Sequence, residues 1–172
     1  MKLKDYILQE IKEIPDFPKK GIIFKDIVPI FQNPILVQQI INTKKELYQG
    51  KVDAVAGIES RGFLIGLPLA LELNVPFVMI RKKGKLPPPV VSQMYKLEYG
   101  EATIEVQTEM IQKNQKILIH DDILATGGTA LATISLIEKL GASVYGLDFL
   151  MEIADLGGKE KLKEYNVESI IN

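Results

Sequence analysis

The sequence predicts an α/β protein built on a parallel, doubly wound β-sheet that is flanked by helices. Apolar runs of strand length alternate along the chain with segments whose apolar residues recur at helical spacing, and this alternation is typical of parallel sheets. The 172 residues correspond to about one domain, at ~150 residues per domain. A hydrophobic content of 47% with 25% charged residues suits a globular core. We therefore expect a single domain over residues 1–172, without internal repeats or a linker.

The first third of the chain is predicted to contain two helices separated by a loop. Apolar residues recur at helical spacing between Leu3 and Ile14, which indicates a surface helix that ends before Pro15. Residues 15–20 contain two prolines and no periodicity, so they are expected to form a loop. Asparagine followed by proline at residues 33–34 is a helix start, and the second helix should run to about residue 49.

The remainder of the chain alternates between predicted strands and helices. Alternating polarity on both sides of residues 100–101 indicates a β-hairpin, and a buried helix over residues 62–73 should kink or restart at Pro68. A further helix face near Ile134 should be closed by Gly141. We expect strands at residues 52–58, 76–81, 92–99, 102–107, 116–120, 143–151 and, at an edge, 167–171, with a short charged helix at 159–165.

The most informative segment is the run ILIHDDILATGGT at residues 117–129. It contains a strand-length apolar run, two acids, a loop of small and hydroxyl residues, and the start of a helical pattern. The two glycines let backbone amides approach an anion closely, and a helix that begins near Thr129 directs its free N–H groups into the same loop. The segment predicts a phosphate-binding loop, in which Asp121 and Asp122 could hold sugar hydroxyls or a phosphate-bound cation.

From the pattern alone, this loop is also compatible with a plain turn in which Thr129 is the helix cap. The two adjacent acids argue against that interpretation, because they repel each other and a plain turn does not need them. The chain contains neither the nucleotide-binding pattern G-x-x-x-x-G-K-[ST] nor the dinucleotide pattern G-x-G-x-x-G. A phosphorylated sugar is therefore the expected ligand.

Composition excludes several other classes of function. The net charge of −1 gives no general attraction to nucleic acid or to an anionic membrane, and no apolar run approaches the ~20 residues of a membrane span. Without cysteine there are no disulfides and no thiol catalysis, which is compatible with a reducing cytoplasm. One histidine makes a structural zinc site improbable. We expect a cytoplasmic protein without a signal peptide.

Five segments in this order resemble the adenine phosphoribosyltransferases, a family of the type I phosphoribosyltransferases. They are PDFPKKGIIFKDI at residues 15–27, ESRGF at 59–63, IRKKGKLP at 80–87, YKLEYG at 95–100 and the loop at 117–129. The resemblance implies the type I phosphoribosyltransferase fold, with an N-terminal helix and base-binding hood over residues 1–33 and a flexible β-hairpin flap over residues 82–107. It also implies a homodimer.

The resemblance implies an enzyme of purine salvage, a glycosyltransferase that converts adenine and phosphoribosyl pyrophosphate to AMP and pyrophosphate. The transition state should carry positive charge on the ribose and growing negative charge on the leaving group, so catalysis means alignment and electrostatic stabilisation. Mg²⁺ is the expected cofactor, bound through the substrate with no direct protein ligand, because it binds with few protein contacts.

The resemblance also assigns roles to individual residues. Glu98 is the expected acid/base at the adenine ring, and Tyr99 beside it closes over the site, with flap hinges at Gly84 and Gly100. The peptide before Ser60 is often cis in the family. The expected ligand contacts are, for the sugar and its 5′-phosphate, Asp121, Asp122, Ala125, Thr126, Gly127, Gly128 and Thr129; for pyrophosphate, Ser60, Arg61, Arg81 and Lys85, the last from the second subunit; and for adenine, Ile23, Phe24, Lys25 and Ile153.

Residue patterns alone leave several of these roles open. Arg61 also fits a surface ion pair at a helix start, the lysines of residues 82–85 fit a solvated loop, and Glu98 fits the outer face of an alternating strand. Lys25 replaces an arginine that is frequent in the family, which is harmless if adenine is read by the backbone. His120 replaces an apolar residue and is interpreted as a hydrogen-bonded structural side chain.

Three other functions are alternatives to this one. A type I transferase for xanthine, hypoxanthine or orotate should differ at residues 15–27 and 95–100. A regulator that senses phosphoribosyl pyrophosphate should carry a DNA-binding segment, for which the residues before Pro15 leave no room. An α/β domain without this activity is hard to reconcile with five ordered segments.

Overall fold

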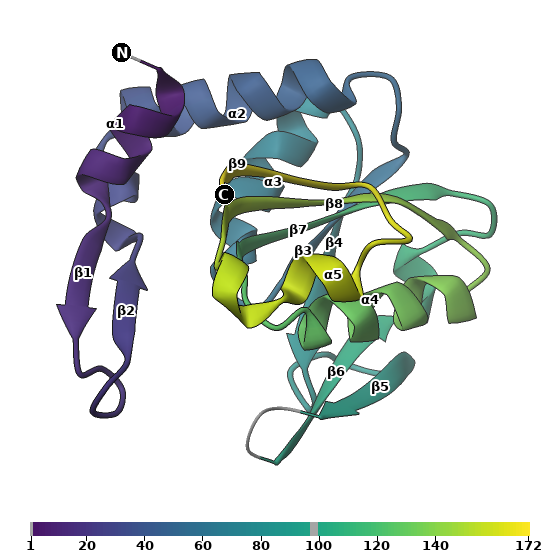
Figure 1. Ribbon diagram of the computed structural model, residues 1–172. Coiled ribbons are helices and arrows are strands. Elements are labelled where there is room, and N and C mark those ends of the chain that lie inside the picture. Colours follow the sequence, from purple (N-terminus) through teal and green to yellow (C-terminus); the bar gives the residue numbers. More distant parts are fainter. Residues whose placement is uncertain (1, 97–99) are drawn as a thin grey trace. The chain divides into compact units, whose positions relative to one another are not determined.

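The computed structural model describes residues 2–96 and 100–172 and contains two compact units, Met1–Leu47 and Tyr48–Asn172 (Figure 1). Each unit has its own secondary structure, and the predicted α/β sheet lies in the second unit. The expectation that residues 1–172 form one domain stays a prediction. No helix in the described part of the chain is long and apolar enough to cross a membrane.

The first unit combines helices with a small antiparallel pair of strands. It contains α1 (Leu3–Glu10), β1 (Lys12–Pro15), β2 (Ile23–Asp26), the short 3-10 helix η1 (Val28–Gln32) and most of α2 (Pro34–Tyr48). The start of α2 was predicted correctly: the Asn33 side chain accepts a hydrogen bond from the Leu36 N–H at 3.1 Å. The unit's buried hydrophobic side chains are those of Ile7, Ile27, Ile30, Leu36, Ile40 and Ile41.

The predicted end of the first helix was wrong, whereas the predicted loop over residues 15–20 is confirmed except at Pro15, which ends a strand. The helix ends at Glu10, and residues 12–15 pair with residues 23–26 in register from Lys12↔Asp26 to Pro15↔Ile23. A residue that precedes proline is disfavoured in the helical region, and pairing with a distant strand offers the backbone an alternative set of hydrogen bonds. Helical spacing of apolar residues could not reveal that partner.

The second unit is built on a seven-stranded sheet with the order β5-β6-β4-β3-β7-β8-β9. Its five parallel strands are β3 (Ala54–Ile58), β4 (Phe77–Lys82), β7 (Lys116–Leu124), β8 (Ser143–Glu152) and β9 (Val167–Ile171). The hairpin strands β5 (Val90–Lys96) and β6 (Glu101–Gln107) extend the sheet antiparallel beyond β4. The predicted hairpin and the predicted edge strand are therefore confirmed.

Strand order places a topological switch point between β3 and β7. Numbered among themselves, the five parallel strands have the order 2-1-3-4-5, because β3 lies between the strand that follows it, β4, and the later strand β7. The chain leaves β3 and β7 on opposite sides of this point, and ligands of open α/β sheets bind beyond the carboxyl ends of such strands. The loops after β3 and β7 are therefore the first candidates for a site.

Helices cover both faces of this sheet (Figure 1). α4 (Gly128–Lys139) packs on one face with Ala54, Ile58 and Ile119, while α3 (Gly62–Leu73) packs on the other with Val55 and Leu118. The remaining elements are short: η2 (Thr108–Met110), η3 (Ala154–Leu156) and α5 (Gly158–Lys161). The doubly wound fold predicted from the sequence is confirmed.

Three predicted elements of this unit needed correction. β7 continues to Leu124, so the two acids lie inside the strand, where Asp121 pairs with Phe149 of β8. α3 runs unbroken through Pro68 because Leu69, Ala70 and Leu73 hold it against the sheet, but Leu71 on its other face is 71% exposed. α5 ends at Lys161, earlier than the expected 165.

Candidate active site

The predicted phosphate loop forms a small cavity at the end of β7. Gly127 has φ +77°, in the left-handed region that favours glycine, and this turn directs the chain from β7 into α4, which begins at Gly128. The free N–H groups of the first turn of α4 and its positive dipole end therefore face this loop. The cavity is lined by Asp121, Ile123, Leu124, Ala125, Thr126, Gly127, Gly128, Thr129, Ala130 and Phe149.

Thr129 has a different local role from the helix cap that the pattern also allowed. Gly127 is the residue that precedes α4, and the Thr129 hydroxyl donates a hydrogen bond to the Tyr95 hydroxyl at 3.2 Å. Tyr95 belongs to β5, so this contact joins the loop to the hairpin. An added Cβ at Gly128 would lie 3.4 Å from the Lys96 carbonyl oxygen. The hairpin therefore borders the cavity.

The other side of the loop rests on the segment that follows β8. The Ile153 N–H donates to the Leu124 carbonyl at 2.8 Å, which places this predicted base-binding residue beside the loop. A Cβ at Gly158 would lie only 2.2 Å from the Ala125 carbonyl oxygen, so only glycine allows this approach. The Gly157-Gly158 pair is visible in the sequence, but it completes no nucleotide-binding pattern, so its role was missed.

The two acids at the end of β7 meet the loop that follows β3. The Nε of Arg61 lies 2.5 Å from Oδ2 of Asp122. The Asp122 side chain is 6% exposed and that of Arg61 is 39% exposed. A buried carboxylate therefore binds Nε of an arginine whose side chain is partly exposed to solvent. The structure thus brings together, across the switch point, one residue predicted to bind ribose and one predicted to bind pyrophosphate.

Asp121 lies in a more constrained position. Its Oδ1 accepts a hydrogen bond from the Asp122 N–H at 2.9 Å, and a Cβ at Gly62 would lie 3.0 Å from the same oxygen. Burial raises the pKa of Asp121 well above its ordinary value, and the neighbouring charge of Asp122 raises that pKa further, while Arg61 opposes the shift. Asp121 therefore resists ionisation, and an approaching positive charge would favour its ionised form.

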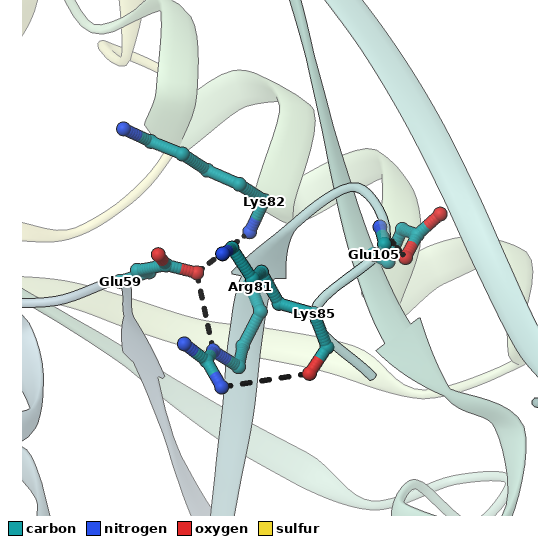
Figure 2. Close-up of polar contacts among 6 residues, drawn as sticks. Glu59, Arg81, Lys82, Lys85 and Glu105 are labelled. Carbon is teal, nitrogen blue, oxygen red and sulfur yellow. Dashed lines mark hydrogen bonds and ion pairs between the residues drawn. The ribbon is translucent and has the colours of Figure 1, made fainter. Parts of the chain in front are cut away.

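The loop after β3 also controls the end of β4 (Figure 2). The Glu59–Ser60 peptide bond is cis, as the resemblance led us to expect. Oε2 of Glu59 accepts hydrogen bonds from Nε of Arg81 at 3.1 Å and from the Lys82 N–H at 2.9 Å. Burial acts to raise the pKa of Glu59, but these hydrogen bonds and the Arg81 charge outweigh it and lower that pKa.

Residues predicted to contact the base are distributed between the two units. Ile23, Phe24 and Lys25 all lie in β2 of the first unit; Phe24 packs edge-to-face on Phe17 with ring centres 5.2 Å apart, and Lys25 pairs with Glu13. Ile153 belongs to the second unit. The predicted catalytic Glu98 and the predicted flap residue Tyr99 lie outside the described residues.

The structure also defines the surroundings of three further polar residues, Lys85, Glu105 and His120. Lys85 is exposed in the turn after β4, and its carbonyl lies 3.5 Å from Nη1 of Arg81. The buried Glu105 was missed from the sequence, because an acid on an alternating strand is normally solvated. His120 is fully buried, and its Nδ1 lies 2.7 Å from Oδ2 of Asp148, in agreement with its interpretation as a structural residue.

Comparison with known proteins gives one consistent result. A family model described as phosphoribosyl transferase domain matches residues 30–171. An adenine phosphoribosyltransferase of Halothermothrix orenii is 49% identical over 172 residues, covering 99% of each chain. The crystal structure of adenine phosphoribosyltransferase from Thermoanaerobacter pseudethanolicus shares 44% identity and a TM-score of 0.94, covering 98% of each chain. The enzyme from Saccharomyces cerevisiae, complexed with an imino-altritol bisphosphate and adenine, shares 39% identity and a TM-score of 0.92, covering 98% of each chain.

The fold and the loop after β7 define a phosphoribosyltransferase, a glycosyltransferase that acts on a phosphorylated sugar. At this identity and coverage, the chain belongs to the adenine phosphoribosyltransferase family. The reaction of that family is purine salvage, the conversion of adenine and phosphoribosyl pyrophosphate to AMP and pyrophosphate.

Proposed function

We propose that this chain forms AMP from adenine and phosphoribosyl pyrophosphate at the carboxyl ends of β3, β4 and β7. The observation that carries the proposal is the phosphate-sized loop at residues 125–129 beside a carboxylate pair, at the switch point of a sheet that belongs to this family. The yeast relative forms a complex with adenine and a sugar-like bisphosphate together, which supports one site for both substrates.

The sugar-phosphate end is assigned to the loop and the acid pair. Backbone amides at the start of α4 would bind the 5′-phosphate, with hydroxyls from Thr126 and Thr129. Asp121 and Asp122 would accept hydrogen bonds from the ribose hydroxyls, and their charge favours the positive charge that develops on the ribose. Burial and the neighbouring Asp122 raise the pKa of Asp121, so positive charge that develops on the ribose would favour the ionised form of this carboxyl.

The pyrophosphate end is assigned to residues of the loops after β3 and β4. Arg61 and Arg81 are each held at Nε by a carboxylate in this structure, and a guanidinium is the group that binds phosphate in a bidentate manner. Ser60 and Lys85 complete this set by resemblance, with Lys85 supplied to the partner subunit. Holding the leaving group in this way favours its departure.

Adenine recognition and proton transfer are assigned to the remaining predicted residues. Backbone groups of Ile23 and Lys25 would read the edge of the base, with Phe24 and Ile153 against its faces. Glu98 would hold the imidazole side of adenine and accept or return its proton during attack. Tyr99 would cover the site when the hairpin closes.

Mg²⁺ fits this arrangement as a cation that arrives with phosphoribosyl pyrophosphate. No group of three or more His, Cys, Asp or Glu side chains that could hold a metal occurs among the described residues, while the carboxylates of Asp121 and Asp122 lie beside the proposed ribose site. When bound, Mg²⁺ would neutralise charge on the pyrophosphate. The acid pair would orient it through the ribose hydroxyls.

A homodimer is proposed as the active assembly. α3 is apolar almost all round, and on the face away from the sheet Leu64, Leu67 and Leu71 are each close to half exposed or more. A helix of this kind is expected to be covered on both sides, and a second copy related by a two-fold axis is the commonest cover.

A cytoplasmic location is also proposed, for which the absence of cysteine is the support.

The test is to incubate the purified chain with phosphoribosyl pyrophosphate, Mg²⁺ and each purine base, and to measure nucleotide formation. Adenine should give AMP, with hypoxanthine and guanine much poorer, because a site that accepts a hydrogen bond from an amino group meets a carbonyl with a buried, unpaired acceptor. Comparable turnover of hypoxanthine would contradict the assignment to adenine.

A further inference from the structure

The turn between β4 and the hairpin is held by two glutamates that no predicted role includes. We define the basic turn as residues 82–85, which contains three lysines and the glycine Gly84 with φ +80°. Glu59 binds one end of this turn, and Glu105 binds the other (Figure 2). A basic segment that the sequence suggested as a hinge is therefore anchored on both sides.

Glu59 contacts both Arg81 and the basic turn. One oxygen, Oε2, accepts from Nε of Arg81 at 3.1 Å and from the backbone N–H of Lys82 at 2.9 Å. The Glu59 side chain is 14% exposed, so these bonds form in a partly desolvated setting, where charged hydrogen bonds are strong. Figure 2 shows the Lys82 side chain directed away from Glu59, so the hydrogen bond from that residue comes from its backbone N–H.

Glu105 anchors the far side of the basic turn to the hairpin. Its Oε2 accepts from the Gly84 N–H at 2.9 Å, and its Oε1 accepts from the Ser92 hydroxyl at 3.2 Å. Glu105 is 5% exposed and lies opposite Arg81 in the ladder between β4 and β6. The turn backbone is thus fixed before any anion arrives, with the N–H of Lys83 also donating to the Thr103 carbonyl at 3.0 Å.

Arg81 keeps binding capacity in this arrangement. A guanidinium has five N–H donors, and the contacts seen among the described residues use Nε for Glu59 and one N–H of Nη1 for the Lys85 carbonyl at 3.5 Å. Three donors therefore stay available to an anion. Because Nε is the pivot of the guanidinium plane, a carboxylate on Nε sets the direction in which the other donors point.

We propose that Glu59 is a positioning residue, which holds the backbone at the start of the basic turn and orients Arg81 as a preformed contact for the pyrophosphate group. This inference rests on the proposed function. Two effects oppose each other when Glu59 is removed. Loss of the carboxylate raises the net charge of the site by one unit, which favours anion binding. It also releases Arg81 from its fixed orientation, which disfavours anion binding. We expect orientation to dominate, since misplacement by about 1 Å can cost on the order of 10²-fold.

The experiment uses the full chain and two readouts: kcat/KM for phosphoribosyl pyrophosphate at saturating adenine and Mg²⁺, and the inhibition constant of pyrophosphate. Glu59→Ala should lower kcat/KM and weaken pyrophosphate inhibition by ~10- to 100-fold, while the KM for adenine stays unchanged. Glu59→Gln keeps an acceptor oxygen and should recover part of the loss. Glu109→Gln removes the same charge from an exposed position beside β6 and is the matched control.

A double-mutant cycle shows whether Glu59 acts through Arg81. In an Arg81→Ala background, removal of Glu59 should change pyrophosphate inhibition by less than about threefold, because coupled residues are not additive. If Glu59→Ala fails to fold, Glu59→Gln completes the same cycle. Tighter pyrophosphate binding in Glu59→Ala, no recovery by Gln, or additive losses would each overturn the proposal. A wild-type chain that makes no AMP would instead refute the proposed function.

Discussion

Gly158 offers a sharp test of how the phosphate loop is supported. An alanine Cβ at this position would lie 2.2 Å from the Ala125 carbonyl oxygen and 2.9 Å from Cδ1 of Leu124. Ordinary contact begins at 3.4 Å, so the carbonyl contact falls short by about 1.2 Å. Because a backbone carbonyl cannot rotate aside like a flexible side chain, the loop itself must move.

The size of the effect follows from this geometry. Overpacking of a well-packed site costs ~1–3 kcal/mol, and in a chain of this size each kcal/mol lowers Tm by about 2–4 °C. Gly158→Ala should therefore lower Tm by roughly 2–12 °C. Displacement of the loop by about 1 Å should raise the KM for phosphoribosyl pyrophosphate by up to about 10²-fold, with the KM for adenine unchanged.

Gly157 provides the matched control. It has φ +66° and no atom within 4 Å of an added Cβ, so Gly157→Ala introduces backbone strain of ~1–2 kcal/mol without pressing on Ala125. Both variants should lose stability in a thermal melt, and only Gly158→Ala should lose affinity in steady-state kinetics. A wild-type KM in Gly158→Ala, or an equal rise in both variants, would refute the reasoning.

Three further outcomes are expected. Glu98→Gln should lower kcat by ~10²–10⁴-fold with little change in affinity for phosphoribosyl pyrophosphate. Asp122→Asn should lower both kcat and that affinity. If Glu98→Gln instead keeps its kcat and loses affinity for phosphoribosyl pyrophosphate, the hairpin is a sugar-phosphate lid. Hydrogen bonds and the Arg81 charge lower the pKa of Glu59 in spite of burial. The ionised Glu59 side chain should therefore stabilise the folded protein fully above the ordinary glutamate pKa of about 4.3. This stabilisation should be lost as the pH falls through the lowered pKa. Melts of wild type and Glu59→Gln across pH should converge in acid, and a constant difference would argue against this linkage. Leu67→Glu should favour monomers in sedimentation at micromolar concentration, and a fully active wild-type monomer would contradict the proposed dimer.

The sequence was sufficient wherever function depends on consecutive residues. The strand, turn and helix start around residues 117–129 adopt the backbone geometry expected of a phosphate-binding loop through local rules, because Gly127 supplies the positive φ and the helix supplies free N–H groups. The same holds for Asn33 at the start of α2, where cap and helix are neighbours in the chain. Glu98 also emerged from a local segment, and its role stays a prediction.

Only the tertiary structure decided which distant residues meet. Strand order and parallel register bring Arg61 to Asp122, Glu59 to Arg81 and Gly158 to Ala125. Hydrophobic periodicity predicts that a segment is a strand, but it does not specify which strand lies beside it or at what offset, because a strand buried on both faces looks alike in any register. For the same reason the pairing of β1 with β2 was missed. The contacts of Glu59 and Glu105 with the basic turn could likewise not be predicted, because their partners are distant in the sequence.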